Sequence, residues 1–462
     1  MAGLDRVSGY DAFFLELESD TQPVNVCCLL ELDTSTMPGG YRYDRLVEAL
    51  DARVGAAPDF RLKLADSQLN PANPVWIEDA DFLIDRHVHR IGLPRPGGRS
   101  ELAEICGHIA ALPLDRSRPL WEMWVIEGPD DADSVAVMMK SHHAAVDGVG
   151  GADLLMHLCG VDKSVPVPVP VAERVSGPPA ASRIEMAAAG IVDVVRRPWR
   201  LVNVVPDTAR TVVNTVQRAV SGEAMAPPFA APSTVFNASL TSRRNVAFTQ
   251  VDLADVKKVK EKFGITVNDV VVAMTSGALR RFLLDREELP EAALVATVPM
   301  STRNKSDRPG RNHTMWMFCR LATDIEDVAE RLEIICGNLS HAKGHGNEMA
   351  PTLIQDWTEF LGRWVLNAAF RLARNIPLPD RPVHNLVLSN VPGPQQPLYF
   401  LGCAINAQYP FGPLVIGAGL NVTVMSLNGR LGIGVISCPD LVSDVWDLAD
   451  AFPVALDELL QL

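Results

Sequence analysis

The sequence lacks the cysteine spacings that build zinc sites or disulfide frameworks. Its eight cysteines are scattered, none forms a Cys-x-x-Cys pair, and Cys27 and Cys28 are immediate neighbours. The opening residues, MAGLDRVSGYDAFF, also lack the apolar core of a signal peptide. We therefore expect reduced thiols and a cytoplasmic protein.

Positive charge and long apolar runs are scarce as well. The formal net charge is −14, which argues against a nucleic-acid-binding protein because such proteins need a clustered basic face. No window of about eighteen residues is apolar and free of charge, so no membrane-spanning helix is predicted. The length of 462 residues and the hydrophobic share of 47% instead indicate a packed globular protein of two or three domains.

Residues 186–220 depart from the acidic balance of the chain. This segment is rich in valine, carries Trp199, and contains five arginines against two aspartates, a local charge of +3. Such a composition suits a helix lying on an anionic membrane surface. An amphipathic helix pair packed on the protein itself is the alternative, and the composition does not decide between them.

The alternation of short apolar runs with helical spacing predicts an α/β chain in two halves. In the first half we expect strands at 24–33, 75–82, 121–128 and 134–140, and helices at 43–54 and 100–114. A proline-rich stretch after Cys159, VDKSVPVPVPV, predicts an extended linker. The second half predicts a strand and helix over 245–264, a helix at 269–284, a strand at 293–300, helices from 324 to 375, and strands in HNLVLSNVPGP, GLNVTVMSL and LGIGVIS.

The stretch SHHAAVDGVGG, residues 141–151, follows a predicted strand and precedes a helical pattern. Open α/β sheets place ligand chemistry at such corners. A phosphate-binding G-x-G-x-x-G turn is excluded because Asp153 stands where the last glycine should be. A metal site is disfavoured because the adjacent His142 and His143 point in different directions, so at most one can pair with Asp147.

Neither a metalloprotease helix nor a serine nucleophile is indicated elsewhere in the sequence. The histidine pair in HAKGH, residues 341–345, lacks the HExxH glutamate and contains a glycine, which predicts a surface turn. No G-x-S-x-G elbow is present, so a serine hydrolase is not supported. What remains is a histidine that removes a proton from a bound hydroxyl while the hydroxyl attacks an activated acyl group, an effect of ~10²–10⁴-fold in rate. Asp147 would either orient that base or brace the loop.

The four residues His142, His143, Asp147 and Gly148 fit the pattern HHxxxDG, and the chain resembles the bacterial wax ester synthase/diacylglycerol acyltransferases of the coenzyme A-dependent acyltransferase superfamily. The resemblance covers nearly the whole chain apart from roughly 162–235. It rests on further segments that match the family: SGYDAFFLELE near the start, Pro119-Leu120-Trp121, Asn268-Asp269, PMSTR from Pro299 to Arg303, NVPGP from Asn390 to Pro394, and GLNVTVMS over 419–426. The chain departs from the family at Pro23-Val24-Asn25-Val26 and at Ser426-Leu427, which bears on substrate preference.

The resemblance implies an α/β fold of two chloramphenicol-acetyltransferase-like lobes with mixed sheets, joined by a helical linker. The corresponding division is 1–161 for the lobe carrying HHxxxDG, 162–235 for the linker and basic helical segment, and 236–462 for the lobe carrying the Asn-Asp motif. It also implies site roles: His143 as general base, His142 and Asp147 as its supports, and Asn268 lining the site from the second lobe. Gly148, Asp269, Trp121 and Arg303 would contribute to substrate binding, although packing is the stronger interpretation for Trp121 and a helix-start or inter-lobe contact for Asp269.

The implied reaction moves a long-chain acyl group from acyl-CoA to diacylglycerol, or to a long-chain alcohol, without an acyl-enzyme. No metal or permanently bound cofactor is implied. The implied setting is the inner face of the cell membrane or a lipid droplet, with a monomer or homodimer and no nucleic acid. Two alternatives stay open: an acyltransferase that takes its donor from a carrier protein, which the acidic charge disfavours, and a non-catalytic lipid-binding protein on the same fold.

Overall fold

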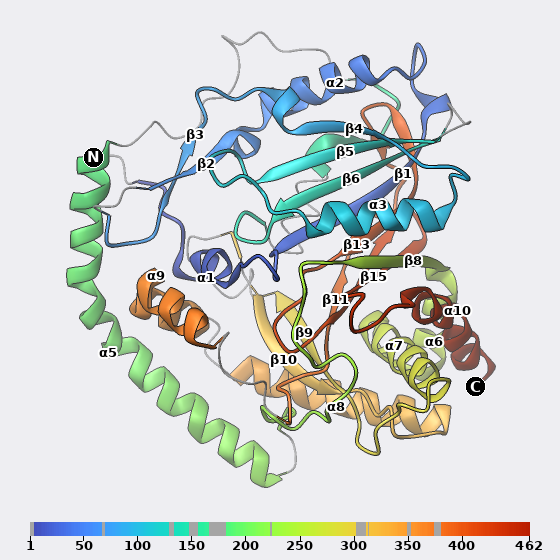
Figure 1. The fold of residues 1–462 in the computed structure, drawn as a ribbon. Helices are drawn as coiled ribbons and strands as arrows, with labels where there is room; N and C mark the ends of the chain where they lie inside the picture. The colour runs from blue at the N-terminus through green and yellow to red at the C-terminus, as the bar shows by residue number, and fades with distance from the viewer. Residues whose placement is uncertain are drawn as a thin grey trace.

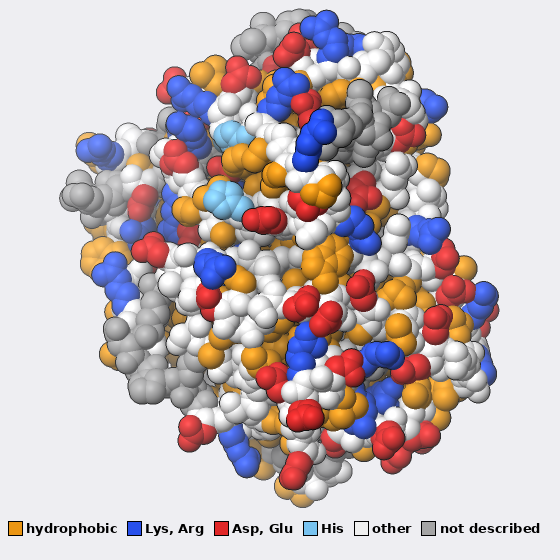
Figure 2. Space-filling model, turned by 45° about the vertical axis from the view of Figure 1, so that its right-hand side comes forward, with side chains coloured by type: hydrophobic (Ala, Val, Ile, Leu, Met, Phe, Trp, Pro, Cys, Tyr) orange, Lys and Arg blue, Asp and Glu red, His pale blue; other side chains and the backbone are white. Residues whose placement is uncertain are grey.

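The computed structural model describes residues 4–66, 70–128, 134–146, 156–165, 182–221, 224–301, 311–312, 314–348, 353–373 and 380–462. Two mixed β-sheets lie one above the other in the view of Figure 1, each covered by helices. The predicted two-lobe α/β fold with mixed sheets is confirmed. On the face shown in Figure 2, acidic and basic side chains are interspersed.

The upper sheet has seven strands in the order β4-β5-β6-β1-β13-β12-β7. Only the β4–β5 pair is parallel; the other pairs are antiparallel. Helices α2 (Tyr43–Ala56) and α3 (Arg99–Ala111) belong to this lobe. The strands are β4 (Val88–Gly92), β5 (Trp121–Glu127), β6 (Ser134–His142), β1 (Asn25–Asp33), β13 (Cys403–Phe411), β12 (Tyr399–Phe400) and β7 (Cys159–Gly160), and a separate hairpin joins β2 (Leu62–Ala65) to β3 (Val75–Glu78).

The lower sheet has six strands in the order β10-β9-β11-β14-β15-β8, and β11 runs parallel to both of its neighbours. Buried aliphatic side chains of this sheet pack against α7 and α10 in one large core. The strands are β10 (Thr314–Arg320), β9 (Val295–Ser301), β11 (Leu386–Val391), β14 (Leu420–Leu427), β15 (Arg430–Ser437) and β8 (Asn245–Asp252); the helices are α6 (Leu253–Phe263), α7 (Val267–Leu284), α8 (Val328–Glu348) and α10 (Val445–Gln461).

Three further helices flank the lobes. Helix α1 (Gly9–Leu17) begins at Ser8, whose hydroxyl accepts the backbone N–H of Asp11. Helix α9 (Leu353–Ala373) is kinked at Gly362, whose φ of 69° favours glycine. Helix α5 (Arg183–Ser221) is a single 39-residue helix along one edge of the molecule, beside α9 (Figure 1). The predicted pair of helices in this segment is therefore one continuous helix.

Two strands of the upper sheet come from the second half of the chain. β13 pairs antiparallel with β1, so the sheet of the first lobe is completed by residues 399–411. The three-part division 1–161, 162–235 and 236–462 stays a prediction, but its third part contributes to both sheets. The sheets also touch, because a Cβ at Gly432 or Gly434 of β15 would overlap the carbonyl oxygen of Gln408 or Pro410 of β13.

One local prediction was wrong. HAKGH is not a surface turn but part of α8, and His345 is almost completely buried. Its two ring nitrogens lie near the Thr215 hydroxyl and the backbone N–H of Met225. Gly344, the glycine that suggested a turn, lies instead where α8 packs against Arg218 of α5, and the following Gly346 faces methionines of the lower sheet.

Candidate active site

A cavity of about 580 Å³ lies where the two sheets meet, a size typical of small-molecule sites. The upper sheet contributes side chains of β1, β6 and β13, and the lower sheet contributes side chains of β9, β10, β11 and β14. Helices α1 and α9 close it with Phe13, Phe14, Leu17, Phe370 and Ala373. Most of the lining is aliphatic or aromatic, so the cavity suits a hydrocarbon chain.

His143 follows directly after β6 and lines this cavity. Its backbone N–H donates to the carbonyl oxygen of Val24 at 2.9 Å, which continues the pairing between β6 and β1. Its ring stacks on Phe14 with centroids 4.1 Å apart and an interplanar angle of 15°. The predicted base is thus presented to the apolar space by a strand end and held flat against an aromatic face.

The ring of His143 also contacts the second lobe. Its Nδ1 lies 3.0 Å from Oδ1 of Asn312, and Nδ2 of Asn312 donates to the His143 carbonyl oxygen at 2.8 Å. The same Nδ2 donates to the Asp11 carboxylate at 2.8 Å. Sequence reasoning missed both Asn312 and Asp11, although Asp11 lies in the opening segment on which the family resemblance partly rests.

His142 faces away from the cavity and is completely buried. Its Nδ1 accepts the backbone N–H of Ala144 at 3.0 Å, and its Nε2 lies 3.5 Å from the Glu18 carboxylate. Burial alone would raise the pKa of Glu18, but the hydrogen bonds and charges of His142 and Arg116 outweigh it and lower that pKa to about 2. His142 thus contacts the backbone just after His143, and its predicted supporting role stays a prediction.

The cavity contains a second histidine, His384, which sequence reasoning did not single out. Its Nδ1 is hydrogen-bonded to the Thr297 hydroxyl, and burial lowers its pKa to about 4, so the ring is neutral at pH 7. Two thiols also line the cavity, and burial raises the pKa of Cys27 and of Cys28 to about 12. Because the thiolate is the nucleophilic form, neither cysteine is poised to form an acyl-enzyme.

Several segments that carried the family resemblance converge on this cavity. Pro299 from PMSTR, Asn390 and Pro392 from NVPGP, and Thr423 from GLNVTVMS all line it. Val26, at the first departure from the family pattern, lines it too. At the second departure, Leu427 packs in the core of the first lobe and Ser426 hydrogen-bonds to the backbone N–H of Gly393.

Comparisons with known proteins agree with this geometry. A model of the wax ester synthase/diacylglycerol acyltransferase catalytic domain matches residues 7–271, and a model of the WS/DGAT C-terminal domain matches residues 311–460. The chain belongs to the wax ester synthase/diacylglycerol acyltransferase family. The family predicted from the sequence is therefore confirmed, and the chain is an acyltransferase of the diacylglycerol and wax ester class.

Relatives of this acyltransferase match it end to end. A Mycobacterium tuberculosis protein whose name assigns it to the diacylglycerol O-acyltransferases is 56% identical over 460 residues, covering 100% of this chain and 91% of its own. The solved wax ester synthase/diacylglycerol acyltransferase of Marinobacter aquaeolei VT8 is 27% identical with a TM-score of 0.71, covering 99% of this chain and 100% of that one. The trichothecene 15-O-acetyltransferase of Fusarium sporotrichioides shares the fold, with a TM-score of 0.60 at 12% identity over 99% and 95% of the two chains.

The acyltransferase does not bring every predicted site residue into the cavity. Asn268 accepts a hydrogen bond from Asn390, a cavity residue, at 3.3 Å, but is not itself among the described residues of the wall. Asp269 forms the capping box of α7 with Thr266 and an ion pair with Lys343 at 3.3 Å. Thr266 is therefore the N-cap of α7, and Asp269 lies in the first turn of that helix.

Trp121 of the acyltransferase packs in a buried core cluster, and its predicted contribution to substrate binding stays a prediction. Its indole N–H donates to the Phe60 carbonyl oxygen at 2.7 Å, and its ring stacks on His87. Asp147, Gly148 and Arg303 lie outside the described residues, so their predicted roles stay predictions. Across the described ranges, no group of three or more His, Cys, Asp or Glu side chains is arranged to hold a metal ion.

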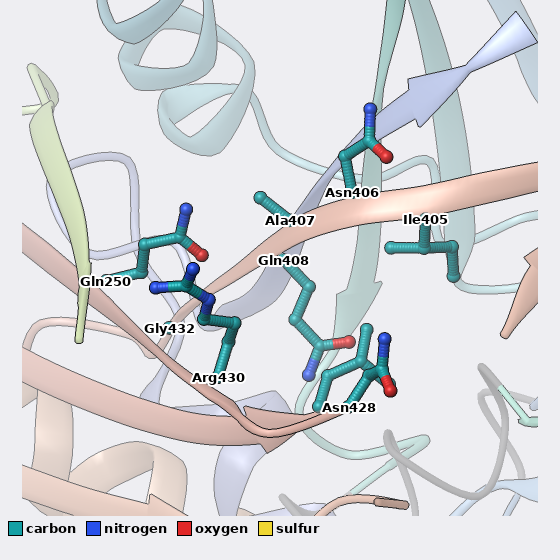
Figure 3. Close-up of a pocket in the computed structure, with 9 residues that line it drawn as sticks. Gln250, Ile405, Asn406, Ala407, Gln408, Asn428, Arg430 and Gly432 are labelled. Atoms are coloured by element: carbon teal, nitrogen blue, oxygen red, sulfur yellow. The ribbon is translucent and has the colours of Figure 1, made fainter. Parts of the chain in front are cut away.

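A second recess of about 30 Å³ lies at the seam between the lobes (Figure 3). Its polar wall comes from Gln250, Asn406, Gln408, Asn428 and Arg430, and Gln408 extends from β13 toward the β14–β15 turn. The side-chain amide of Gln408 is buried with no protein hydrogen-bond partner among the described residues. The recess is large enough for water but not for an acyl group, so it is too small to be the acyl site.

Proposed function

We propose that the protein transfers a long-chain acyl group from acyl-CoA to the free hydroxyl of diacylglycerol, forming triacylglycerol, with His143 as general base. The position of His143 in the wall of the apolar cavity supports this proposal. An imidazole in such a wall can take the hydroxyl proton as the substrates meet, and the apolar lining disfavours water as a competing acceptor.

The proposed step is a direct transfer. The diacylglycerol oxygen attacks the thioester carbonyl carbon while His143 removes its proton, and a C–O bond forms. The tetrahedral intermediate then breaks its C–S bond, and the departing coenzyme A thiolate receives the proton from the imidazolium. We assign the side-chain amide of Asn390, which lines the cavity, as the candidate donor to the oxyanion, and Asn268, whose Oδ1 accepts a hydrogen bond from that amide, as its support. A long-chain alcohol entering the same cavity would give a wax ester by the same step.

Thiol release from acyl-CoA, measured with and without diacylglycerol, tests the proposal. His143→Ala should lower the acceptor-dependent rate by roughly 10²–10⁴-fold, whereas His384→Ala, the matched change of the other cavity histidine, should retain most of it. Retention of full activity by a folded His143→Ala variant would remove His143 from the mechanism. Absence of acceptor-dependent release with diacylglycerol and with long-chain alcohols would favour the non-catalytic lipid binder.

We also propose that helix α5 rests on a lipid surface, since diacylglycerol is a membrane lipid. Seven of its exposed apolar residues recur three or four positions apart within 191–202 and within 213–220. The eleven positions between these two runs are about three helical turns, so all seven lie on one face of the helix. Their exposed fractions are large: Ile191 56%, Val195 66%, Trp199 76%, Val202 66%, Val213 54%, Val216 57% and Val220 85%. We call these seven residues the α5 stripe.

Two arginines of α5 face the protein. Arg200 pairs with Asp193 at 2.7 Å and with Glu359 of α9 at 3.2 Å, and Arg197 packs against the kink at Gly362. Arg197 and Arg200 therefore make contacts within the fold. The apolar α5 stripe, rather than the charge of these two arginines, would contact lipid.

The α5 stripe is connected to the cavity through α9. That helix exposes Trp364 and Leu372 to solvent, while its Phe370 and Ala373 line the cavity. A lipid surface against α5 and α9 would therefore adjoin the site where the acceptor reacts. None of the helices in the described part of the chain has both the length and the hydropathy to cross a bilayer.

A further inference from the structure

The orientation of the Asn312 side chain is determined by its partners. Its Nδ2 lies 2.8 Å from an Asp11 carboxylate oxygen and 2.8 Å from the His143 carbonyl oxygen, and both of these groups accept hydrogen bonds. Reversing the amide would place its oxygen against two acceptors. The amide oxygen is therefore the atom that faces the His143 ring.

This orientation fixes the protonation of the ring. An amide oxygen can only accept a hydrogen bond, so the Nδ1 atom of His143, 3.0 Å away, carries the hydrogen. In the neutral imidazole the basic lone pair is then on Nε2. Stacking on Phe14 holds the ring plane in the same position.

Asp11 in turn fixes Asn312. Its carboxylate is almost completely buried and accepts from the backbone N–H of Arg311 at 3.0 Å and of Asn312 at 2.9 Å, in addition to the Asn312 side chain. Gln355 of α9 donates to the Asn312 carbonyl oxygen at 3.1 Å. A buried, multiply bonded carboxylate of the first lobe thus anchors a residue of the second lobe beside the base.

We infer that Asn312 and Asp11 are positioning residues that hold His143 in the Nδ1–H tautomer, so that Nε2 serves as the base. The inference rests on the proposed role of His143. Contacts across the lobe interface then select the tautomer of His143. Nε2 is held as the basic nitrogen only when Asn312 contacts His143 and Asp11 holds Asn312 in place.

The tautomer can be measured separately from activity. Long-range ¹H–¹⁵N spectra of protein with labelled histidines, with His143→Ala used to assign the signal, should show the Nδ1–H form of His143 in the native protein. In Asn312→Ala that signal should shift toward a mixture or toward the Nε2–H form. An unchanged Nδ1–H signal in a folded Asn312→Ala protein would overturn the inference.

Kinetics give the second readout. Asn312→Ala should lower kcat by roughly 10²-fold with little change in KM for acyl-CoA, whereas Gln355→Ala, which removes only the bond to the Asn312 backbone, should have a much smaller effect. The isosteric Asn312→Asp places a carboxylate against the imidazole, which stabilises the imidazolium and should move the acidic limb of the kcat/KM profile up by about 1 pH unit.

A purely structural role for Asn312 would lower activity in both variants and leave the pH profile in place, and that outcome would also overturn the inference. Asp11→Asn combined with Asn312→Asp removes the repulsion between two carboxylates and should recover part of the kcat lost in Asn312→Asp. If His143→Ala keeps its activity while Asn312→Ala changes the tautomer, the proposed function fails and the positioning geometry stands.

Discussion

The imidazole of His143 lies parallel to the phenyl ring of Phe14, with ring centroids 4.1 Å apart. Phe14 is one helical turn after Asp11 on α1, so both side chains lie on the same side of that helix. Helix α1 therefore supplies both the ring on which His143 stacks and the carboxylate that binds Asn312, the amide partner of His143.

Replacing Phe14 with leucine tests the contribution of that surface. Leucine keeps an apolar side chain in the cavity wall but removes the planar contact, so we expect kcat to fall severalfold while the melting temperature changes little. Phe14→Ala should in addition cost ~3–5 kcal/mol of stability, because it leaves a hole in a buried cluster. Equal kcat for the leucine variant and the native protein would show that stacking does not orient His143.

Glu18 makes stability depend on pH in the acidic range. Its pKa is about 2 in the folded protein against an ordinary value of 4.5, so the folded state holds the proton less tightly than the unfolded state. The resulting stabilisation is present at neutral pH and is lost as the pH falls from about 5 to 2. The free energy of unfolding, measured with urea, should therefore rise between pH 3 and pH 7. Glu18→Gln should reduce the slope of this free energy against pH. Glu261→Gln, an exposed change on α6, should leave the slope unaltered.

The α5 stripe predicts lipid binding that depends on apolar contact. Val195→Asp, Val202→Asp and Val213→Asp together should abolish co-flotation with vesicles containing anionic lipid and diacylglycerol, because the charges would enter the lipid interface. Arg210→Gln, which neutralises an exposed arginine of the same helix, should retain most of the binding. A native dimer that becomes monomeric in the triple variant, with vesicle binding unchanged, would identify the stripe as a subunit interface instead.

The close contact between β15 and β13, where the two sheets meet, predicts that replacing a glycine there lowers the stability of the protein. Gly432→Ala would force a methyl group into the Gln408 carbonyl oxygen on β13, so we expect a loss of at least about 1–3 kcal/mol, the ordinary range for overpacking. Gly337→Ala is the matched control, since the position that its methyl group would take is open space and an alanine in α8 should add ~0.5–1 kcal/mol. Thermal or urea unfolding of both variants tests this. A Gly432→Ala protein as stable as the native protein would show that the two sheets can move apart to admit the methyl group.

Elements with strong apolar periodicity could be predicted from the sequence. The strand at 24–33 corresponds to β1, the helix at 43–54 to α2, and the helix at 269–284 to α7. β13 was missed because Asn406, Gln408 and Pro410 interrupt its apolar pattern; its place between β1 and β12 comes from tertiary contacts. α10 was missed because Pro453 lies within it, yet its apolar face packs in the core of the second lobe.

The candidate site was predictable only where its residues share a local motif. His143 follows from HHxxxDG and the strand before it, and the structure places it in the cavity wall. Asn312 carries no local signal, because its importance comes from meeting a residue 169 positions earlier in the chain. His384 was likewise invisible, since a histidine becomes a neutral cavity residue only through the burial that the fold imposes.

The position of β13 has a consequence for how the chain is made. During synthesis β1 emerges early, but the strand that pairs with one of its edges is not available until residues 403–411 have been added. Until then the nascent first lobe presents an unpaired edge of β1, of the kind that joins neighbouring chains into aggregates. A fragment ending near residue 271 would keep that edge open permanently, so the region matched by the catalytic-domain family model should not fold on its own.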